Sequence, residues 1–351
     1  MNTLPKRYLL AVLGFGFFMT GTLEAEPQAP KPAEEAFTGE ESGVGSFATL
    51  TMENDLFAGK DGGYTNGIGF SWGYGPYDDY ADTSSPDWLI GVSDFLFIDR
   101  DDPREKAVSF SIFQGMQTPE DIESEAIVEN DLPYAGLLGW RGTLYAWDNS
   151  IADQFSVIVG MVGPASLAED TQKVVHRITG SDEPRGWDNQ LHNELVFSVN
   201  GQRSWRFDMS NGEGVEMDFL TFASASMGTY NSEVATSAMV RFGSGLAETF
   251  PAVSILPGRD INPLAGSGSD HFYMFLGGQA RYVFNDIFVD GNTFRDSHSV
   301  TLKHEGFIVS AGAVWNWEQW GMLFSVAETS STFEERDGKS RFGSLSFSYR
   351  F

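Results

Sequence analysis

Large apolar residues alternate with glycine or small polar residues in many segments of this chain. Residues 68–75, for example, read Ile-Gly-Phe-Ser-Trp-Gly-Tyr-Gly. Because successive side chains of a β-strand point to opposite faces, this period of two gives a strand with one apolar face and one face of small residues. The pattern therefore indicates strands that meet two different environments.

The same alternation returns along the chain, and turn-rich polar segments separate its occurrences. The further alternating segments are residues 108–112, 155–161, 234–242, 272–282 and 345–351. A soluble β-sandwich also alternates, but an apolar outer face over strands of about ten residues is typical of transmembrane barrels. We therefore expect an all-β fold, a transmembrane antiparallel β-barrel of about twelve strands. Such a barrel has a lumen that side chains can largely fill, which disfavours a wide diffusion pore.

The last alternating segment has large residues on one face and ends the sequence on an aromatic residue. The residues on this face are Leu345, Phe347, Tyr349 and Phe351. This arrangement resembles the C-terminal signal by which outer-membrane barrels are recognised for assembly. It implies that the barrel-assembly machinery is a partner during biogenesis.

The N-terminal segment has the features of a secretory signal peptide. Lys6 and Arg7 precede an apolar run at residues 8–20, and residues 23–25 (Leu-Glu-Ala) offer a cleavage site. The run is shorter than the roughly 20 residues that a helix needs to cross a membrane. The expected organisation has three parts: a signal peptide (1–25), a flexible segment rich in Pro and Glu (26–43) and a barrel in the bacterial outer membrane (44–351).

Charge and cysteine content exclude several classes of function. The formal net charge is −27 and there is no cysteine. A strongly acidic chain is not expected to bind nucleic acid, because phosphate binding needs a basic surface. The lack of cysteine excludes disulfides, thiolate metal sites and a cysteine nucleophile. Carboxylates in expected loops, such as residues 120–129, are interpreted first as solvating groups and alternatively as ligands of divalent cations.

One segment departs from the strand pattern and predicts a short helix in a loop. Ser166 and Glu169 have the spacing of a capping box ahead of residues 170–179, and Gly180 suits the end of the helix. The helix has two distinct faces. The polar face carries Gln172, His176 and Thr179, and the apolar face, expected to dock on the barrel rim, carries Val174, Val175 and Ile178.

A histidine on a helix is more often a surface or packing residue than a catalytic one, so His176 needs further support. The common hydrolase motifs are missing. There is no Gly-x-Ser-x-Gly sequence, and His304-Glu305 lacks the second histidine of a zinc protease helix. A serine-elbow or zinc hydrolase is therefore not expected.

A set of segments resembles the outer-membrane lipid A deacylase family, typified by the lipid A 3′-O-deacylase. They occur in the family's order from residue 46 to residue 194, with a weaker match at residues 290–294. The matching segments are residues 53–57 (Glu-Asn-Asp-Leu-Phe), 64–67 (Tyr-Thr-Asn-Gly), 117–119 (Gln-Thr-Pro), 131–136 (Asp-Leu-Pro-Tyr-Ala-Gly), the expected helix at 172–180, and 186–194 (Gly-Trp-Asp-Asn-Gln-Leu-His-Asn-Glu). The combination is specific, although no single segment would be.

The resemblance implies a barrel whose active site lies between the wall and a loop helix at the outer leaflet, where a calcium ion assists hydrolysis of an acyl ester. By position, His176 matches the family's general base and Gln172 the helix residue one turn before it. Asn54, Asp55 and Thr65 match its strand-borne polar residues. Spacing alone would assign Asn54 and Asp55 to a turn and Thr65 to an ordinary strand position.

The matched residues give a coherent hydrolysis without a covalent nucleophile. Neutral His176 would accept a proton from water as the water attacks the ester carbonyl. A calcium ion held by carboxylate and amide oxygens would stabilise the developing oxyanion. The expected ligands are Asp55, Asn54 and Asp182, and Thr65 would hydrogen-bond the water or the ion. Hard oxygen ligands favour calcium over zinc, although a histidine with two carboxylates could also hold zinc.

Two positions depart from the family. Asp182 stands where the family's deacylase has a glutamate, so its side chain is one methylene shorter, and Glu183 is an alternative. The loop after Pro119 is acidic where basic residues are expected, and Leu132 replaces an arginine. A cationic clamp for lipid A phosphates is therefore missing there.

The expected function is an outer-membrane hydrolase that removes an ester-linked acyl chain from lipid A, with outer-leaflet lipopolysaccharide as partner. The acidic loop favours a less phosphorylated lipid A or a greater need for divalent cations. The alternatives are an outer-membrane phospholipase and a non-catalytic channel or structural barrel. Three tryptophans are assigned to the interfacial aromatic girdle rather than to the site, namely Trp72, Trp140 and Trp187.

Overall fold

The fold was analysed in a computed structural model, which describes most of the chain. The described residues are 45–55, 64–83, 85–93, 103–210, 214–256, 270–336 and 338–351. The predicted signal peptide (1–25) and the predicted flexible segment (26–43) lie outside the described residues.

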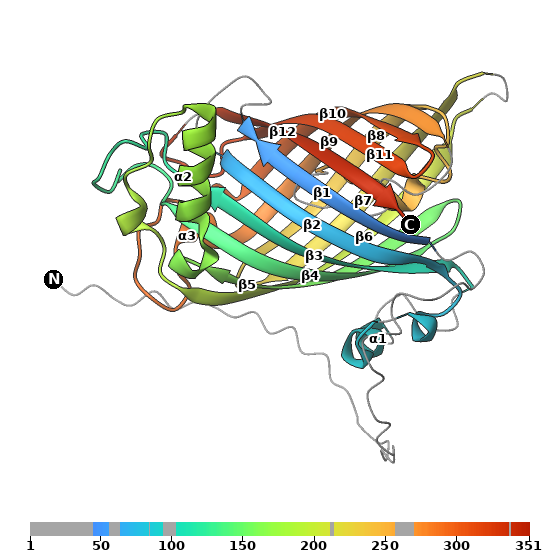
Figure 1. Cartoon of the computed structure of the whole chain (residues 1–351), viewed down its shortest axis with the longest axis horizontal. Coiled ribbons are helices and arrows are strands. Elements are labelled where there is room, and N and C mark those ends of the chain that lie inside the picture. Colours follow the sequence, from blue (N-terminus) through green and yellow to red (C-terminus); the bar gives the residue numbers. More distant parts are fainter. Residues whose placement is uncertain are drawn as a thin grey trace, which may run out of the picture. The chain divides into compact units, whose positions relative to one another are not determined.

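Within the described residues, twelve strands form one antiparallel sheet. Each strand pairs with its neighbours in sequence, and β1 also pairs with β12, so the sheet closes into a barrel (Figure 1). The predicted barrel and its strand number are thus confirmed. The strands are β1 (Gly45–Asn54), β2 (Tyr64–Tyr77), β3 (Glu105–Gln117), β4 (Ala135–Trp147), β5 (Ile151–Val162), β6 (Glu194–Asp208), β7 (Glu216–Gly228), β8 (Asn231–Gly243), β9 (His271–Asp286), β10 (Glu305–Trp317), β11 (Trp320–Ser330) and β12 (Lys339–Arg350).

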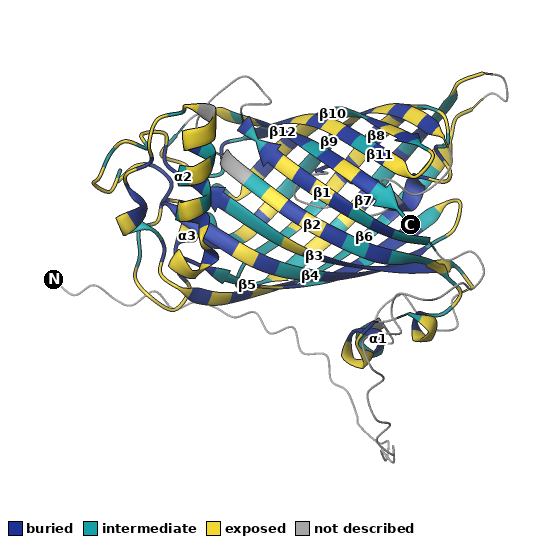
Figure 2. Ribbon diagram, viewed as in Figure 1, coloured by how far each residue is buried: buried dark blue, intermediate teal, exposed yellow. Residues whose placement is uncertain are grey.

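The alternation along β1 and β12 places small polar side chains in the lumen. Thr49 and Thr51 are buried and hydrogen-bond the hydroxyls of Ser348 and Ser346 across the closing pair, each at 2.8 Å. Leu50, between the two threonines, is exposed on the outside. Exposed and buried residues therefore alternate along the strands (Figure 2), as a barrel with an apolar outer surface requires.

The two ends of the barrel carry different structures. Gly45 and Arg350 lie at one end, which we call the terminal end, and Asn54 and Lys339 lie at the other, which we call the helix end. Two helices, α2 (Ala168–Thr179) and α3 (Ile287–Asp290), lie at the helix end (Figure 1). Helix α1 (Asp87–Ser93) follows β2 at the terminal end. No helix in the described part of the chain is both long and apolar enough to cross a membrane.

Helix α2 is the helix predicted from the sequence, but its N-terminal cap is not the one predicted. Leu167, with a positive φ of 59°, is the N-cap residue and makes no side-chain capping bond. Glu169 bonds Lys173 instead, at 2.6 Å, so there is no capping box with Ser166. The predicted end is correct, because Gly180 adopts the left-handed conformation at φ 76°.

Part of the connection between β8 and β9 folds into the lumen at the terminal end. We call residues 244–256 the plug. Its buried apolar side chains are Leu246, Phe250, Val253, Ile255 and Leu256. They pack against inward side chains of the wall, among them Leu220, Phe222, Met239, Tyr273 and Phe275. The expected inner face of glycine and polar residues is therefore wrong for the parts of β7–β9 that pack against the plug, because there the strands face apolar side chains. Toward the helix end the inner face of the same strands is polar, with residues such as Ser226, Glu233 and Gln279.

A buried ion pair anchors the plug to the wall. Arg241 and Asp218 have fully buried side chains and bond through two contacts of 2.9 and 2.6 Å. Arg241 also donates to the carbonyl of Leu246 and to the hydroxyl of Thr249 in the plug, at 2.5 and 2.9 Å. Glu216 accepts from the Leu246 amide at 2.8 Å. The plug is thus fixed by charged groups that the barrel interior desolvates.

We expect Arg241→Met to loosen the plug. Loss of one partner of a buried ion pair costs about 3–5 kcal/mol, and the cost should be smaller here because Arg206 still pairs with Asp218 at 2.7 Å. The barrel should unfold at a lower temperature than the parent, as measured by heat-modified gel migration. Because the plug would no longer fill the lumen firmly, the variant should also conduct ions in planar bilayers. Arg341→Met, which removes an exposed ion pair with Glu328, is the control. A variant as heat-resistant and non-conducting as the parent would contradict this anchoring role.

Candidate active site

A row of paired residues crosses four strands at the helix end. Asn54 pairs with Asn66, Asn66 with Met116, and Met116 with Gly136. Neighbouring strands lie about 4.8 Å apart, so the backbones of Asn54 and Met116 are separated by about 10 Å. The predicted residue Thr65 falls at the irregularity between Tyr64 and Asn66 in the β2–β3 pairing. Such bulges re-aim the backbone and are frequent beside active sites.

Helix α2 lies on the outer surface of β3 and β4 at this row. Met116 and Gly136 have the same strand parity as the exposed residues Ile112 and Leu138, which places them on the outward face. Ala168 of α2 covers Gly136 so closely that a Cβ on this glycine would collide with Ala168 and Ser166. Gln114, also outward, donates to the Ser166 carbonyl at 2.6 Å. The helix is therefore clamped to the outside of the wall.

The face of α2 that meets the wall is the polar face. Gln172 and His176 are buried, with 1% and 9% of their surfaces exposed, and follow Ala168 at spacings of four. Val174 and Ile178 are 50% and 80% exposed. The predicted docking of the apolar face is thus wrong. The close contact at Gly136 needs a small residue, and the face that begins with Ala168 supplies one.

The ring of His176 is held in one tautomer by the chain that follows the helix. The amides of Gly180 and Ser181 both bond the His176 carbonyl, at 2.8 and 3.1 Å, which turns the chain back toward the ring. The Nδ1 atom then lies 2.5 Å from the carbonyl oxygen of Asp182. Because a carbonyl only accepts, Nδ1 carries the proton, and in the neutral ring Nε2 keeps its lone pair. This is the tautomer that a general base needs.

Gln172 is fixed by a residue that the sequence analysis assigned elsewhere. Trp187 donates from Nε1 to Gln172 Oε1 at 2.8 Å. Trp187 is 2% exposed and packs against Tyr134, so its assignment to an interfacial girdle is wrong. Trp72 and Trp140 do lie on the outward face, with ring centroids 5.9 and 6.0 Å from Phe110. The one sequence feature that could have indicated a role for Trp187 in the site is its position within the matched segment 186–194.

The strand-borne residues Asn54 and Asp55 occupy the end of β1. Asn54 has the outward parity of Leu50 and is half-buried, and Asp55 is 3% exposed. The backbone of Thr65 lies in β2, and its side chain is outside the described part of the structure. These three residues and α2 therefore belong to the same end of the barrel, and Asn54 lies in the same strand row as the residues that α2 covers.

The three expected calcium ligands differ in environment. Asp55 is buried and Asn54 is half-buried. The side chain of Asp182 is exposed, and its backbone carbonyl accepts a hydrogen bond from His176. Among the described residues, no group of three or more His, Asp or Glu side chains could hold a metal ion. Any cation here would therefore be bound by few carboxylates, with amide, carbonyl or water oxygens completing its shell.

The acidic loop between β3 and β4 supports the chain that leaves α2. Ile122 accepts from the amide of Arg185 at 2.8 Å, and Glu125 accepts from the side chain of Asn189 at 2.9 Å, both through their carbonyls. Leu132, which replaces the expected arginine, is buried in a cluster with Val289 and other apolar residues. The departure from the family thus has a packing reason at this position.

Two side chains tie the segment after α2 to the β9–β10 connection. Asn292 accepts from the His192 amide at 2.8 Å and donates to the His192 carbonyl at 2.9 Å. Glu194 accepts from Asn292 and from the amides of Thr293 and Phe294. The weaker match at residues 290–294 therefore corresponds to a clamp on the loop that carries Trp187.

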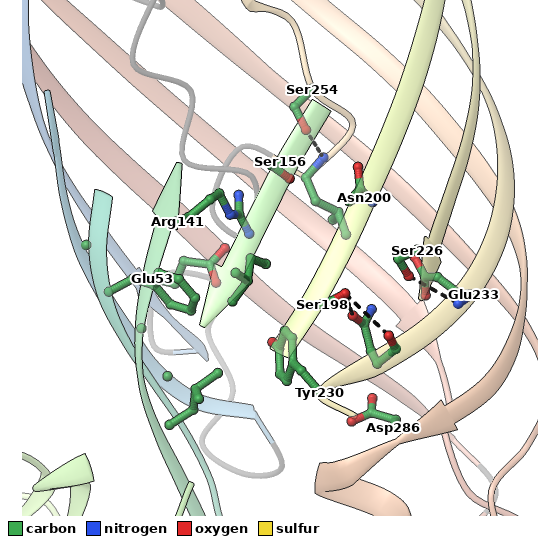
Figure 3. A pocket seen from close by; sticks show the side chains of 18 of the residues that line it. Glu53, Arg141, Ser156, Ser198, Asn200, Ser226, Tyr230, Glu233, Ser254 and Asp286 are labelled. Atoms are coloured by element: carbon green, nitrogen blue, oxygen red, sulfur yellow. Dashed lines mark hydrogen bonds between the residues drawn. The ribbon is translucent and has the colours of Figure 1, made fainter. Parts of the chain in front are cut away.

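A separate cavity of about 200 Å³ lies inside the barrel (Figure 3). Its lining includes Glu53, Arg141, Asn200 and Glu233, and Ser254 of the plug also contributes. None of the lining residues belongs to α2. The lumen is therefore distinct from the candidate site, which is built on the outer surface of the wall.

We expect Gly136→Ala to displace α2 and to reduce the ester hydrolysis that the sequence resemblance implies by about tenfold to a hundredfold, because small displacements of catalytic groups are costly. The control is Gly115→Ala on the neighbouring strand, where an added Cβ meets nothing within 4 Å. Both barrels should show the heat-modified migration of the parent. Equal activity of the two variants would show that the contact at Gly136 does not position the helix.

Comparisons with known proteins extend over nearly the whole chain. The family model described as "Outer membrane protein LpxR" matches residues 17–351. No curated protein sequence gives a significant match. Among solved structures, LpxR from Salmonella typhimurium aligns with a TM-score of 0.68 and 18% identity over 87% of this chain and 99% of that chain. The translocator domain of the autotransporter NalP from Neisseria meningitidis aligns with a TM-score of 0.41 and 8% identity, over 89% and 90% of the two chains.

The structural likeness to the Salmonella protein concerns the fold, since the two sequences share few residues. It agrees with the closed barrel of twelve strands within the described residues. The family match confirms the predicted resemblance and the predicted location in the outer membrane. This chain belongs to the outer membrane protein LpxR family.

Proposed function

We propose that this protein is an outer-membrane lipid A deacylase that hydrolyses an ester-linked acyl chain. Membership of the LpxR family supports the assignment. The observation that carries it is His176, buried against the outer wall with Nδ1 bonded to a carbonyl. The site lies at the end opposite to the start of β1 and the end of β12. In bacterial barrels this end faces outward from the cell, where lipid A is found.

His176 acts as the general base in this proposal. Its Nε2 accepts a proton from water while the water oxygen attacks the ester carbonyl. The ester C–O bond then breaks, and the same nitrogen returns the proton to the leaving alkoxide. The Asp182 carbonyl stabilises the protonated ring through Nδ1. The products are a fatty acid and a lipid in which the hydroxyl of the cleaved ester has become free.

We further propose that a calcium ion binds at the end of β1. Its ligands would be Asp55 and Asn54, with the exposed Asp182 carboxylate as a third. The donor set fits, because calcium prefers hard oxygen ligands and Asp55 supplies a carboxylate that is shielded from solvent. When bound, the ion would supply Lewis-acid stabilisation of the oxyanion. Thr65, at the bulge of β2, would hydrogen-bond the water or the ion.

The substrate has to approach an acidic surface. Arg336, beside the acidic loop, is 2.9 Å from Glu120 and 3.5 Å from Asp131, so its charge is engaged within the protein. An anionic glycolipid would therefore need bridging divalent cations or would carry fewer phosphates than usual. We propose a preference for lipid A with few phosphates.

The function is tested by mass spectrometry of lipid A incubated with the refolded protein and calcium. The parent should release a fatty acid, and His176→Ala should be slower by about a hundredfold to ten-thousandfold because the base is lost. His192→Ala is the matched control, because the side chain of His192 is exposed. Intact lipid A with cleaved phospholipid would point to a phospholipase. No cleavage of either lipid would point to a non-catalytic barrel.

The metal is tested with Asp55→Ala. Chelation should abolish hydrolysis by the parent, and added calcium should restore it. The variant should need a higher calcium concentration or stay inactive, because it loses a buried carboxylate ligand. Asp188→Ala, an exposed carboxylate at the same end, is the control. Activity that is indifferent to chelation and to loss of Asp55 would exclude the proposed calcium site.

A further inference from the structure

The amide of Gln172 is buried, and one end of it has no partner among the described residues. Its oxygen, Oε1, accepts from Trp187, but its nitrogen, Nε2, has no hydrogen-bond partner in the described structure. A buried donor left without an acceptor costs free energy, so native proteins satisfy nearly all of them. An orphan donor one helical turn from His176 points to a ligand that completes it.

Trp187 decides which end of the amide is left over. The indole Nε1–H can only donate, so the atom of Gln172 that meets it must be the acceptor Oε1. Nε2 is thereby fixed on the remaining side as a donor. Without the indole N–H, the amide could rotate by half a turn and present an acceptor instead.

The indole itself has little freedom to move. Its ring centroid lies 5.0 Å from that of Tyr134, and it packs in a cluster with Met116 and Ala168. A Cβ on Gly186, the residue before Trp187, would collide with the Tyr134 ring, so the approach is close on that side too. The Tyr134 hydroxyl donates to the Ile122 carbonyl at 2.9 Å. Burial raises the pKa of Tyr134 to about 12, so it stays a neutral donor.

We propose that Trp187 is a positioning residue that orients Gln172 so that Nε2 donates to the ester carbonyl oxygen of the substrate. The interaction strengthens as negative charge develops on that oxygen during attack by water. Gln172 and His176 lie four residues apart on one helix face, so donor and base meet the same ester group. The proposal rests on the proposed hydrolase function.

The test is Trp187→Phe, which removes the N–H and keeps an aromatic ring beside Tyr134. Initial rates on lipid A in detergent micelles should show kcat about tenfold to a hundredfold lower, as expected for a misplaced oxyanion donor, with KM nearly unchanged. Gln172→Glu keeps an acceptor for the indole but removes the donor, so it should lose at least as much kcat. Trp72→Phe should behave as the parent, because Trp72 pairs with Phe110, six residues along the strands from the Asn66–Met116 pair at α2.

A double-variant cycle separates positioning from packing. In a Gln172→Leu background, Trp187→Phe should cause no further loss of kcat, because its effect passes through the amide. A full additional loss would show that Trp187 acts by packing alone and would overturn the proposal. If Trp187→Phe had the same kcat as the parent, in an assay in which His176→Ala had lost its activity, the proposal would also be overturned. Lack of hydrolysis by the parent itself would instead refute the proposed function.

Discussion

The pairing of β1 with β12 is the interaction on which the whole structure depends. Inside a membrane there is no water to satisfy backbone amides and carbonyls, so a sheet can cross only if it has no open edge. The closing pair is uninterrupted from Phe47 to Asn54, and its inward hydroxyls bond one another. Closure leaves the outward face to lipid and makes the lumen a separate compartment, which the plug fills at the terminal end.

Closure also dictates where a lipid-directed site can be built. An acyl ester of a membrane lipid meets the outside of the wall, and the outward residues of the strands can be covered there by a helix. Gly136 and Gln114 make this possible, the first by leaving room for Ala168 and the second by bonding the helix start. The result is that Gln172 and His176 are shielded between helix and wall. In the proposed hydrolase, this polar pair would act at the edge of the apolar membrane phase.

Much of the fold could be predicted because a barrel repeats one local rule. The period of two predicted the strands, and Gly180 marked the end of α2. What could not be predicted depends on contacts between distant residues. The partner of Trp187 is fifteen residues away, so the alternation of apolar residues alone gave no sign that its indole bonds Gln172. The plug does not alternate, and it is held in the lumen by Arg241, whose buried charge is paired with Asp218 on another strand.

The acidic loop holds the segment that leads to Trp187 through its backbone. Its carboxylates stand where the family resemblance predicts basic residues that would bind lipid A phosphates. In the structure, the carboxylate of Asp131 accepts from the amides of Glu120 and Leu132, and carbonyls of the loop hold the segment that leads to Trp187. The loop therefore supports the segment of the proposed site largely through backbone carbonyls, which do not depend on the identity of the side chains. In the proposed function, the charge of this loop could therefore differ between family members without displacing Trp187.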